Sequence, residues 1–213
     1  MSKVCRVVVL ISGNGSNLQA IIDQSSKAPY QVVGVITNKT DAYGIQRAAA
    51  ADVATSTVIA QADERRDQYD QRLQQAIDSY QPDLIVLAGF MRILSDALVE
   101  RYQGKMLNVH PSLLPRFTGL NTHQRAIDAG DTEHGASVHF VVPELDAGPV
   151  ILQAKVPVFE DDTAQFLADR VHEQEHAIYP LVVKWFAEGR LQMVDGVALL
   201  DGNPLAAHGY AAD

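Results

Sequence analysis

Cysteine is nearly absent from this sequence, because Cys5 is the only one among 213 residues. A single cysteine excludes an internal disulfide bond and any zinc or iron–sulfur site built from a cysteine cluster. We interpret Cys5, which lies in an apolar run, as a small buried hydrophobic residue. The lack of a disulfide framework favours a reducing compartment, and we expect a cytoplasmic protein.

Positive charge and long hydrophobic runs are also scarce. The 17 Lys and Arg residues are outnumbered by 26 Asp and Glu residues, which gives a net charge of −9. A chain of this sign repels phosphate backbones at long range, so we expect no nucleic-acid partner, although a local basic pocket for a small anion stays open. The apolar run at residues 7–11 is too short for a signal peptide or a membrane span, and we expect no membrane partner.

The succession of apolar segments predicts an α/β fold. At about 150 residues per domain, and without repeats or linkers, the chain is expected to form a single domain over residues 1–213. Apolar patterns predict strands at residues 4–11, 32–37, 53–60, 84–88, 105–110, 136–142 and 150–158. Helices are predicted over residues 18–22, at 45–51, from a cap at Asp63 to before Pro82, from a cap at Ser95 to 102, at 122–130 and at 163–188, with a hairpin at 191–200. This alternation is typical of a Rossmann-like fold, an open, mostly parallel twisted sheet with helices on both faces.

A glycine-rich turn at residues 13–17 separates the first predicted strand from the first predicted helix. Backbone N–H groups and the helix dipole bind anions at such turns, so this is a candidate phosphate site. The dinucleotide-binding fingerprint is incomplete because Leu18 replaces its third glycine, and the lysine of a Walker loop is missing. A tight turn with an Asn or Ser helix cap explains these residues equally well. The turn's place after the first strand, at an end where open α/β sheets bind ligands, favours the phosphate site.

Asn108 and His110 are two residues apart at the end of a predicted strand, so their side chains are expected to share one face. An amide donor beside an imidazole suits addition to a carbonyl group, because the pair can stabilise an oxyanion and transfer a proton. Asp146, in a loop with glycine and proline, is a candidate for holding that imidazole protonated and oriented. The alternative is structural, because a histidine at a strand end and an aspartate in a turn are common without catalysis.

Residues 172–176 read His-Glu-Gln-Glu-His, which matches the zinc-protease pattern within a predicted helix. The spacing of four would place both imidazoles on one helix face. The extended motif requires glycine and histidine at positions that hold Tyr179 and Val182 here. A third ligand is therefore missing, and zinc stays open only as an alternative.

Other charged and imidazole side chains carry weaker signals. Arginine binds carboxylate and phosphate groups through its planar fork of donors, and the candidates are Arg66, Arg92 and Arg116. Three further histidines lack paired metal-ligand spacing and are assigned no ligand role: His123, His134 and His139.

Five segments together are specific. They are residues 12–19 (SGNGSNLQ), 88–94 (AGFMRIL), 108–115 (NVHPSLLP), 137–140 (SVHF) and 146–149 (DAGP). They closely resemble the folate-dependent phosphoribosylglycinamide formyltransferases of purine synthesis, and the resemblance continues through residues 176–180. The Asn, His and Asp elements are shared by the wider formyltransferase superfamily, whereas residues 12–17 discriminate the acceptor.

The resemblance implies the formyltransferase fold and a metal-free transfer of formyl from 10-formyltetrahydrofolate to the amine of glycinamide ribonucleotide, in IMP biosynthesis. It implies that Gly15, Ser16 and Asn17 bind the substrate phosphate, and that the glycinamide part faces His172, Glu173, Gln174 and Glu175. The implied folate site comprises Arg66, Met91, Arg92, Ile93, Leu94, Asn108, Val142, Pro143, Glu144, Leu145 and Asp146. We expect a monomer or a weak homodimer.

The family's catalytic residues correspond to Asn108, His110 and Asp146. In the implied mechanism Asn108 and protonated His110 stabilise a tetrahedral oxyanion, and Asp146 holds His110. His110 or a bridging water then moves the proton to the departing folate nitrogen. The His-Glu-x-x-His match becomes part of the family's own pattern. Three residues depart from common family choices and affect the expected loop rigidity and fine substrate contacts: Thr118, Asn121 and His172.

Three alternatives use parts of the same pattern. A formyltetrahydrofolate hydrolase would use the same three residues with water as acceptor, but that family normally carries an N-terminal regulatory domain, for which we expect no room before residue 4. A methionyl-tRNA formyltransferase resembles the chain less at residues 12–17 and normally has a C-terminal RNA-binding domain, which an acidic chain disfavours. A non-catalytic nucleotide-binding module would use the glycine turn and leave His110 idle.

Overall fold

The computed structural model describes residues 3–210, and the chain divides into two compact units after Leu107. The first unit contains four strands: β1 (Cys5–Ile11), β2 (Tyr30–Thr37), β3 (Thr55–Thr57) and β4 (Leu84–Leu87). All their pairings are parallel, with β1 between β2 and β4 and with β3 beyond β2. The side chains of β1 are fully buried from Val7 onward, as expected of a parallel strand covered on both faces. Cys5 is buried in β1, and this burial raises the pKa of its thiol to about 11.

Four helices complete the first unit: α1 (Ser16–Ser25), α2 (Gly44–Ala50), α3 (Arg66–Ser79) and α4 (Asp96–Arg101). α1 packs against α2 and β2, and α3 packs against α4. The chain moves outward from β1 to β3 and then returns to place β4 on the other side of β1. Because crossovers are right-handed, the two directions place α1 and α2 on one face and α3 on the other. The carboxyl ends of β1 and β4 therefore flank a topological switch point, where open sheets bind ligands.

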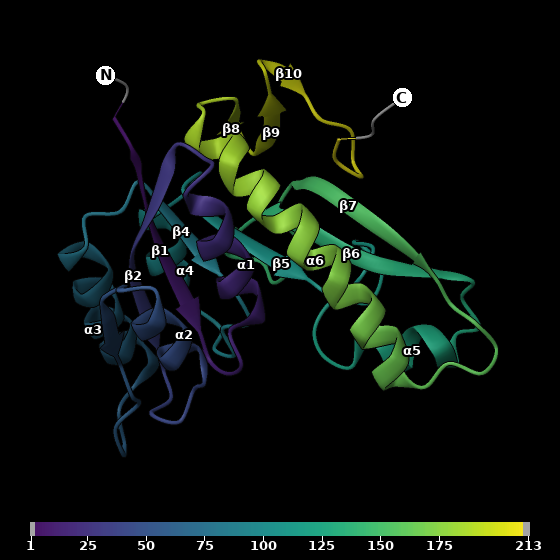
Figure 1. The fold of residues 1–213 in the computed structure, drawn as a ribbon, viewed down its shortest axis with the longest axis horizontal. Helices are drawn as coiled ribbons and strands as arrows, with labels where there is room; N and C mark the ends of the chain where they lie inside the picture. The colour runs from purple at the N-terminus through teal and green to yellow at the C-terminus, as the bar shows by residue number, and fades with distance from the viewer. Residues whose placement is uncertain (1–2, 211–213) are drawn as a thin grey trace. The chain divides into compact units, whose positions relative to one another are not determined.

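The second unit is built on an antiparallel pair, β6 (Glu133–Phe140) and β7 (Val150–Pro157). The long helix α6 (Ala164–Ala187) packs on both strands, and α5 (Thr122–Asp128) packs on α6, as Figure 1 shows. The register shifts after Val138: Val138 faces Leu152, whereas His139 faces Val150, so Ile151 is an extra residue on β7. A β-bulge of this kind changes the direction of the side chains beside it.

β5 (Met106–His110) spans the division between the units. The strands hydrogen-bond in the order β3-β2-β1-β4-β5-β6-β7. The prediction of an α/β fold with an open, mostly parallel sheet is confirmed. The single domain over residues 1–213 stays a prediction.

α6 continues through Pro180, as the sequence predicted. Proline removes one hydrogen bond of the helix ladder, but the buried Tyr179, Val182 and Val183 keep this part of α6 packed. At its start, the Thr163 hydroxyl accepts a hydrogen bond from the Phe166 N–H at 3.2 Å, as an N-cap residue does. Within residues 3–210, no helix is both long and apolar enough to cross a membrane.

The C-terminal part forms a small antiparallel sheet of β8 (Leu191–Val194), β9 (Val197–Leu200) and β10 (Asn203–Pro204). The hairpin predicted at residues 191–200 is confirmed, whereas β10 was not predicted. Tyr210 then returns to β7, where its N–H donates to the Ile151 carbonyl at 2.7 Å. Its ring meets the Trp185 ring edge-on, with 5.5 Å between centroids.

Three predicted boundaries are wrong. Asp63 does not cap α3, because residues 61–64 close a turn of their own and the residue before the helix is Arg65. The strand predicted at residues 53–60 comprises only β3. The strand predicted at 136–142 is β6, which starts three residues earlier because Glu133 already pairs with Pro157.

Candidate active site

Asn108 and His110 come from the end of β5, in the sequence Asn108-Val109-His110. His110 is 6% exposed and Asn108 is half-buried. The alternation of a strand predicts that both side chains leave the same face. Both side chains have His139 as a neighbour. The Nε2 of His139 lies 3.1 Å from Nδ2 of Asn108, and the imidazole of His110 is one of the groups that lower the pKa of His139.

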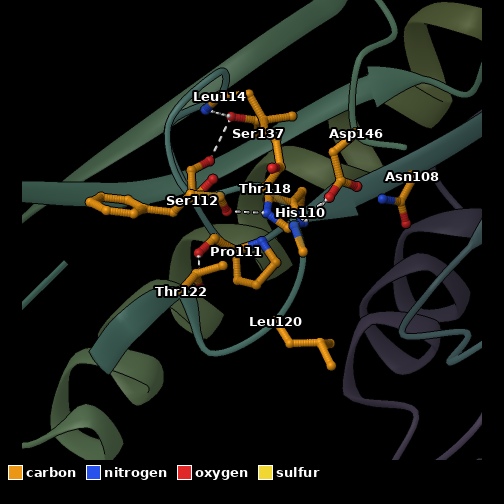
Figure 2. Close-up of polar contacts among 12 residues, drawn as sticks. Asn108, His110, Pro111, Ser112, Leu114, Thr118, Leu120, Thr122, Ser137 and Asp146 are labelled. Carbon is orange, nitrogen blue, oxygen red and sulfur yellow. Dashed lines mark hydrogen bonds and ion pairs between the residues drawn. The ribbon is translucent and has the colours of Figure 1, made fainter. Parts of the chain in front are cut away.

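His110 has an acceptor at each ring nitrogen. Its Nδ1 lies 3.5 Å from Oδ2 of Asp146, and both side chains are only 7% exposed. Its Nε2 lies 2.8 Å from the Phe117 carbonyl oxygen. Figure 2 shows the imidazole beside the Asp146 carboxylate. Because a carboxylate and a carbonyl oxygen both accept, this arrangement accommodates a proton on each ring nitrogen.

The loop after β5, which contains the Phe117 carbonyl, has an unusual backbone. Phe117, Gly119 and Asn121 all have positive φ angles, of 53°, 78° and 58°. Phe117 and Asn121 are strained in this region, and such strain is often found at functional sites. The Gly119 N–H donates to Oδ2 of Asp146 at 2.8 Å, so Asp146 holds both the loop and the imidazole. Asp146 itself has a φ of 53°.

A buried serine holds the start of this loop, as Figure 2 shows. The Ser137 hydroxyl donates to the Ser112 carbonyl at 2.6 Å and accepts from the Leu114 N–H at 3.0 Å. Gln153 of β7 donates to Ser137 and to the Leu114 carbonyl, each at 2.9 Å. On the other side, the Thr122 hydroxyl donates to the Pro111 carbonyl at 2.6 Å. The residues that follow His110 are thus fixed by side chains from β6, β7 and α5.

His139 is a residue that the sequence interpretation missed. Its Nε2 lies 3.1 Å from Nδ2 of Asn108, although no ligand role was assigned to it. A signal was present in the sequence, because His139 follows Ser137 by two residues and therefore shares its face of β6.

In the first unit, the turn at residues 13–17 joins β1 to α1. The helix cap is Gly15, with a φ of 74° and no side-chain cap, so the alternative of an Asn or Ser cap is wrong. Glycine is required here for a second reason: a Cβ at this position would lie 2.8 Å from the Cα of Gly44. Arg47 holds the turn, since its Nε and Nη2 donate to the backbone and side-chain oxygens of Asn14, each at 2.9 Å. Because Gly15 has no side chain, the residue at the cap position supplies no side-chain oxygen to the N-terminus of α1.

Ser12 connects the two loops at the switch point. Its hydroxyl donates to Oδ1 of Asn38 at 2.6 Å and accepts from the Met91 N–H at 2.8 Å. The Ser12 hydroxyl therefore links the loop after β1 to the loop after β4, at the carboxyl ends of these strands.

The predicted folate residues of the first unit are Arg66, at the start of α3, and the segment 91–94, which contacts α3. Arg66 donates through Nη2 to the Leu94 carbonyl, and the Arg92 guanidinium lies 3.9 Å from the centroid of the Tyr69 ring. Burial raises the pKa of the Tyr69 hydroxyl. Met91 and Ile93 are 65% and 62% exposed, an unusual exposure for large apolar side chains.

The predicted site residues of the second unit lie in two places. Residues 142–146 form the loop between β6 and β7, where Pro143, Glu144 and Leu145 are exposed and only the Asp146 side chain is buried. The others, residues 172–175, lie on α6, where Glu175 is 3% exposed.

The two imidazoles of the His-Glu-x-x-His match do share a face of α6, as predicted. The His172 and His176 rings are stacked, with centroids 6.5 Å apart and planes 10° apart. Among residues 3–210, no group of three or more His, Cys, Asp or Glu side chains is arranged to hold a metal ion. Arg116, a candidate for anion binding, is paired instead with Asp131 at 2.6 Å.

Comparisons of the sequence with a family model and with known proteins all indicate the same family. A family model described as "Formyl transferase" matches residues 5–183. The chain is 59% identical over 209 residues to the phosphoribosylglycinamide formyltransferase of Escherichia coli K12, covering 97% of this chain and 99% of that protein. It is 49% identical over 208 residues to the enzyme of that name from Haemophilus influenzae, covering 97% and 98%.

Solved structures agree with these relatives. The phosphoribosylglycinamide formyltransferase of Coxiella burnetii, solved in complex with CHES, superposes with a TM-score of 0.92 at 52% identity, covering 97% of this chain and 98% of that one. The model match, the identity and the coverage together show that this chain belongs to the formyl transferase family.

Proposed function

We propose that this protein transfers the formyl group of 10-formyltetrahydrofolate to the amine of N1-(5-phospho-D-ribosyl)glycinamide, in the synthesis of purine nucleotides. The observation that carries the proposal is the buried pair of His110 and Asp146, in which His110 lies on the strand that also carries Asn108. This arrangement occurs in a chain that matches a phosphoribosylglycinamide formyltransferase at 59% identity over nearly the full length of both proteins.

The proposed reaction forms one C–N bond and breaks another. The glycinamide amine attacks the formyl carbon, and the formyl oxygen becomes a tetrahedral oxyanion. Asn108 and protonated His110 donate hydrogen bonds to this oxygen. Collapse restores the C=O bond and breaks the bond to the folate nitrogen. That nitrogen receives the proton that the attacking nitrogen gives up, through His110 or a bridging water.

Asp146 supports the protonated form of His110. Its carboxylate lies 3.5 Å from Nδ1, and the 7% exposure of both side chains limits screening by water. The Phe117 carbonyl accepts from the other ring nitrogen. Donation from Nε2 to a substrate therefore requires this carbonyl to give up its hydrogen bond.

The substrate phosphate is proposed to bind at Gly15, Ser16 and Asn17. The positive end of the α1 dipole lies at this glycine turn, and Arg47 adds positive charge to it. The glycinamide part is proposed to face residues 172–175 of α6. Among them, the buried carboxylate of Glu175 is chemically suited to an amine.

The formyl donor is proposed to bind at Arg66, at residues 91–94 and at residues 142–146. The residues present fit a folate. Exposed Met91, Ile93 and Leu145 offer apolar surface to a planar ring system, and the guanidinium of Arg92 suits a carboxylate. The donor supplies the activated formyl group, and these residues bind and orient it.

The cellular setting is part of the same proposal. The net charge of −9 supports small-molecule substrates over nucleic acid, and the single cysteine supports the cytoplasm. We propose a metal-free enzyme that acts as a monomer or a weak homodimer.

A folate-absorbance assay tests the proposal, with purified protein, 10-formyl-5,8-dideazafolate and glycinamide ribonucleotide. We expect release of the deformylated folate only when glycinamide ribonucleotide is present, at a rate that EDTA does not change. Asn108→Ala should lower turnover by about 10² or more, because it removes a preorganised donor to the oxyanion. Turnover of that variant within a few-fold of wild type would contradict the assigned role.

Other outcomes of the assay support other functions. Release of folate without glycinamide ribonucleotide would indicate a formyltetrahydrofolate hydrolase. No release, combined with binding of free nucleotides, would indicate a nucleotide-binding module. Zinc that stays bound through dialysis, with activity lost in EDTA, would revive the metal site at residues 172–176.

A further inference from the structure

His139 is a buried imidazole whose two ring nitrogens both have partners. It is 2% exposed, and it lies at the carboxyl end of β6. Its Nδ1 lies 2.9 Å from the Phe140 carbonyl oxygen, and its Nε2 lies 3.1 Å from Nδ2 of Asn108. The hydrogen bonds of Asn108 are therefore linked to the state of this ring.

The partners determine which nitrogen carries the proton. A carbonyl oxygen only accepts, so Nδ1 of His139 must be the N–H donor to Phe140. The Nε2 of a neutral ring is then an acceptor, and it meets the amide end of Asn108 that carries hydrogens. The opposite tautomer would place an Nε2–H against that NH₂ group and would leave the Phe140 carbonyl without this donor.

The surroundings keep the ring neutral. Burial lowers the pKa of His139 to about 4, and the two charged groups that act on it have opposite effects. The Asp146 carboxylate favours a proton on His139, and the His110 imidazole disfavours one. At neutral pH His139 is therefore an uncharged hydrogen-bond acceptor.

Two features of the backbone fix this ring. The register shift falls opposite Val138 and His139, where Ile151 is the extra residue on β7, and the alternation of β6 keeps the His139 side chain on the face of Ser137. Gly148 lies against the same carbonyl: a Cβ there would overlap the Phe140 oxygen and would lie 3.5 Å from Nδ1 of His139. The glycine of the Asp146-Ala147-Gly148-Pro149 segment thus leaves room for the His139–Phe140 hydrogen bond.

We propose that His139 is a positioning residue for the proposed reaction, on which this inference rests. As the neutral Nδ1–H tautomer, it accepts one amide hydrogen of Asn108 and so fixes the orientation of the carboxamide. The second amide hydrogen of Asn108 has no protein acceptor among residues 3–210, so it is available to the formyl oxygen. A fixed donor at this point requires no reorganisation when the oxyanion forms.

The state of the ring can be measured without activity. In ¹⁵N-labelled protein, long-range ¹H–¹⁵N spectra report the tautomer of each histidine, and loss of one signal set in His139→Phe assigns this residue. We expect an Nδ1–H tautomer that does not titrate between pH 8 and pH 5.5. An Nε2–H tautomer, or titration near the ordinary histidine pKa of about 6.5, would overturn the proposal even if the wild-type enzyme is active.

A double-mutant cycle then tests whether His139 acts through Asn108. We expect His139→Phe to lower kcat about 10-fold or more, with the KM of both substrates changed less than about 3-fold. In the Asn108→Ala background the same change should lower kcat by less than about 2-fold, because the carboxamide it orients is gone. Multiplicative effects would show that His139 acts independently of Asn108 and would overturn the proposal.

Two further variants separate positioning from folding. His139→Gln keeps a donor and an acceptor at the end of the side chain, and we expect its kcat to lie between those of wild type and His139→Phe. Val138→Ala is the control, because Val138 is fully buried in the same strand and alternation places its side chain on the opposite face. It should lower stability and leave kcat unchanged, and a fall in kcat equal to that of His139→Phe would contradict the inference. Inactivity of wild type would contradict the proposed function, and the tautomer measurement would still stand.

Discussion

A single oxygen of Asp146 serves both His110 and the loop that follows it. Oδ2 lies 3.5 Å from Nδ1 of His110 and accepts the Gly119 N–H at 2.8 Å. The negative charge beside the imidazole and the position of the loop are therefore not independent. A change that moves the loop at Gly119 also changes the electrostatic environment of His110.

Asp146→Asn tests this coupling. The amide keeps the shape but removes the negative charge that lies 3.5 Å from Nδ1 of His110, which the proposed mechanism requires, so we expect kcat to fall by about 10² or more. The fold should persist, because an Asn oxygen can still accept from Gly119. Steady-state kinetics and circular dichroism measure the two effects, and a kcat within a few-fold of wild type would contradict the role of Asp146.

Gly15→Ala tests the turn before α1. Alanine at a φ of 74° is strained, and its Cβ would lie 2.8 Å from the Cα of Gly44, so we expect a loss of about 2 kcal/mol of unfolding free energy. If the phosphate binds here, the KM for glycinamide ribonucleotide should rise about 10-fold, while the KM for the folate changes little.

Gly196→Ala is the matched control for that change. Gly196 lies in the β8–β9 turn with a φ of 77°, and nothing lies within 4 Å of a Cβ built there. It should reproduce the backbone strain without changing either KM. An equal rise in KM in both variants would mean that general destabilisation, and not the turn, weakens substrate binding.

Ser137→Ala tests the buried support of the loop after His110. The variant removes one donor and leaves the Ser112 carbonyl, the Leu114 N–H and Gln153 each without one partner. We expect the unfolding free energy to fall by about 3 kcal/mol, with a lower kcat as the loop becomes less fixed. Urea denaturation measures the first effect, and a loss below about 0.5 kcal/mol would contradict the importance of the network.

The stability of the fold should depend on pH through His139. Its folded pKa of about 4 lies below the value of about 6.5 expected in the unfolded chain. The unfolded chain therefore binds a proton first as the pH falls, so this stabilisation is complete above pH 6.5 and is lost between pH 6.5 and 4. One such group contributes a slope of up to about 1.4 kcal/mol per pH unit.

Urea denaturation at several pH values between 8 and 4 measures this slope. His139→Gln should reduce it within that window, and part of the slope should remain because burial also lowers the pKa values of His123 and His134. His208→Gln is the control, because His208 is exposed, and it should leave the slope unchanged. A slope that is identical in wild type and in His139→Gln would contradict the predicted linkage.

The sequence predicted features that depend on local periodicity. The succession of strands and helices followed from apolar spacing, and the common face of Asn108 and His110 followed from the alternation of a strand. Two of the wrong predictions concern helix starts, where neighbouring residues compete for the same capping position and apolar periodicity does not distinguish them. Asp63 is a good capping residue, but residues 61–64 close their own turn, and α3 begins after Arg65. At Gly15 the close approach of Gly44 mattered more than the neighbouring Asn and Ser cap residues.

The site itself depends on contacts between distant residues. Asp146 meets His110 because β6, β7 and the loop between them bring it there, and spacing in the sequence carries no information on this distance. The contact of His139 with Asn108 likewise joins residues that are 31 positions apart in the chain. Alternation assigns each side chain to a face of its own strand, but it does not predict which side chain of another strand it meets.

Tyr210 contacts the edge of a strand that would otherwise be exposed there. β7 is the last strand of the large sheet, and an open strand edge is a template for association with another chain. The hydrogen bond from Tyr210 to the Ile151 carbonyl, and the parallel bridge between Tyr210 and Leu152, occupy that edge at the bulge. The segment that ends at Tyr210 thus covers part of this edge. A chain shortened after β10 should keep its chemistry but aggregate at lower concentration, because the edge of β7 is then exposed.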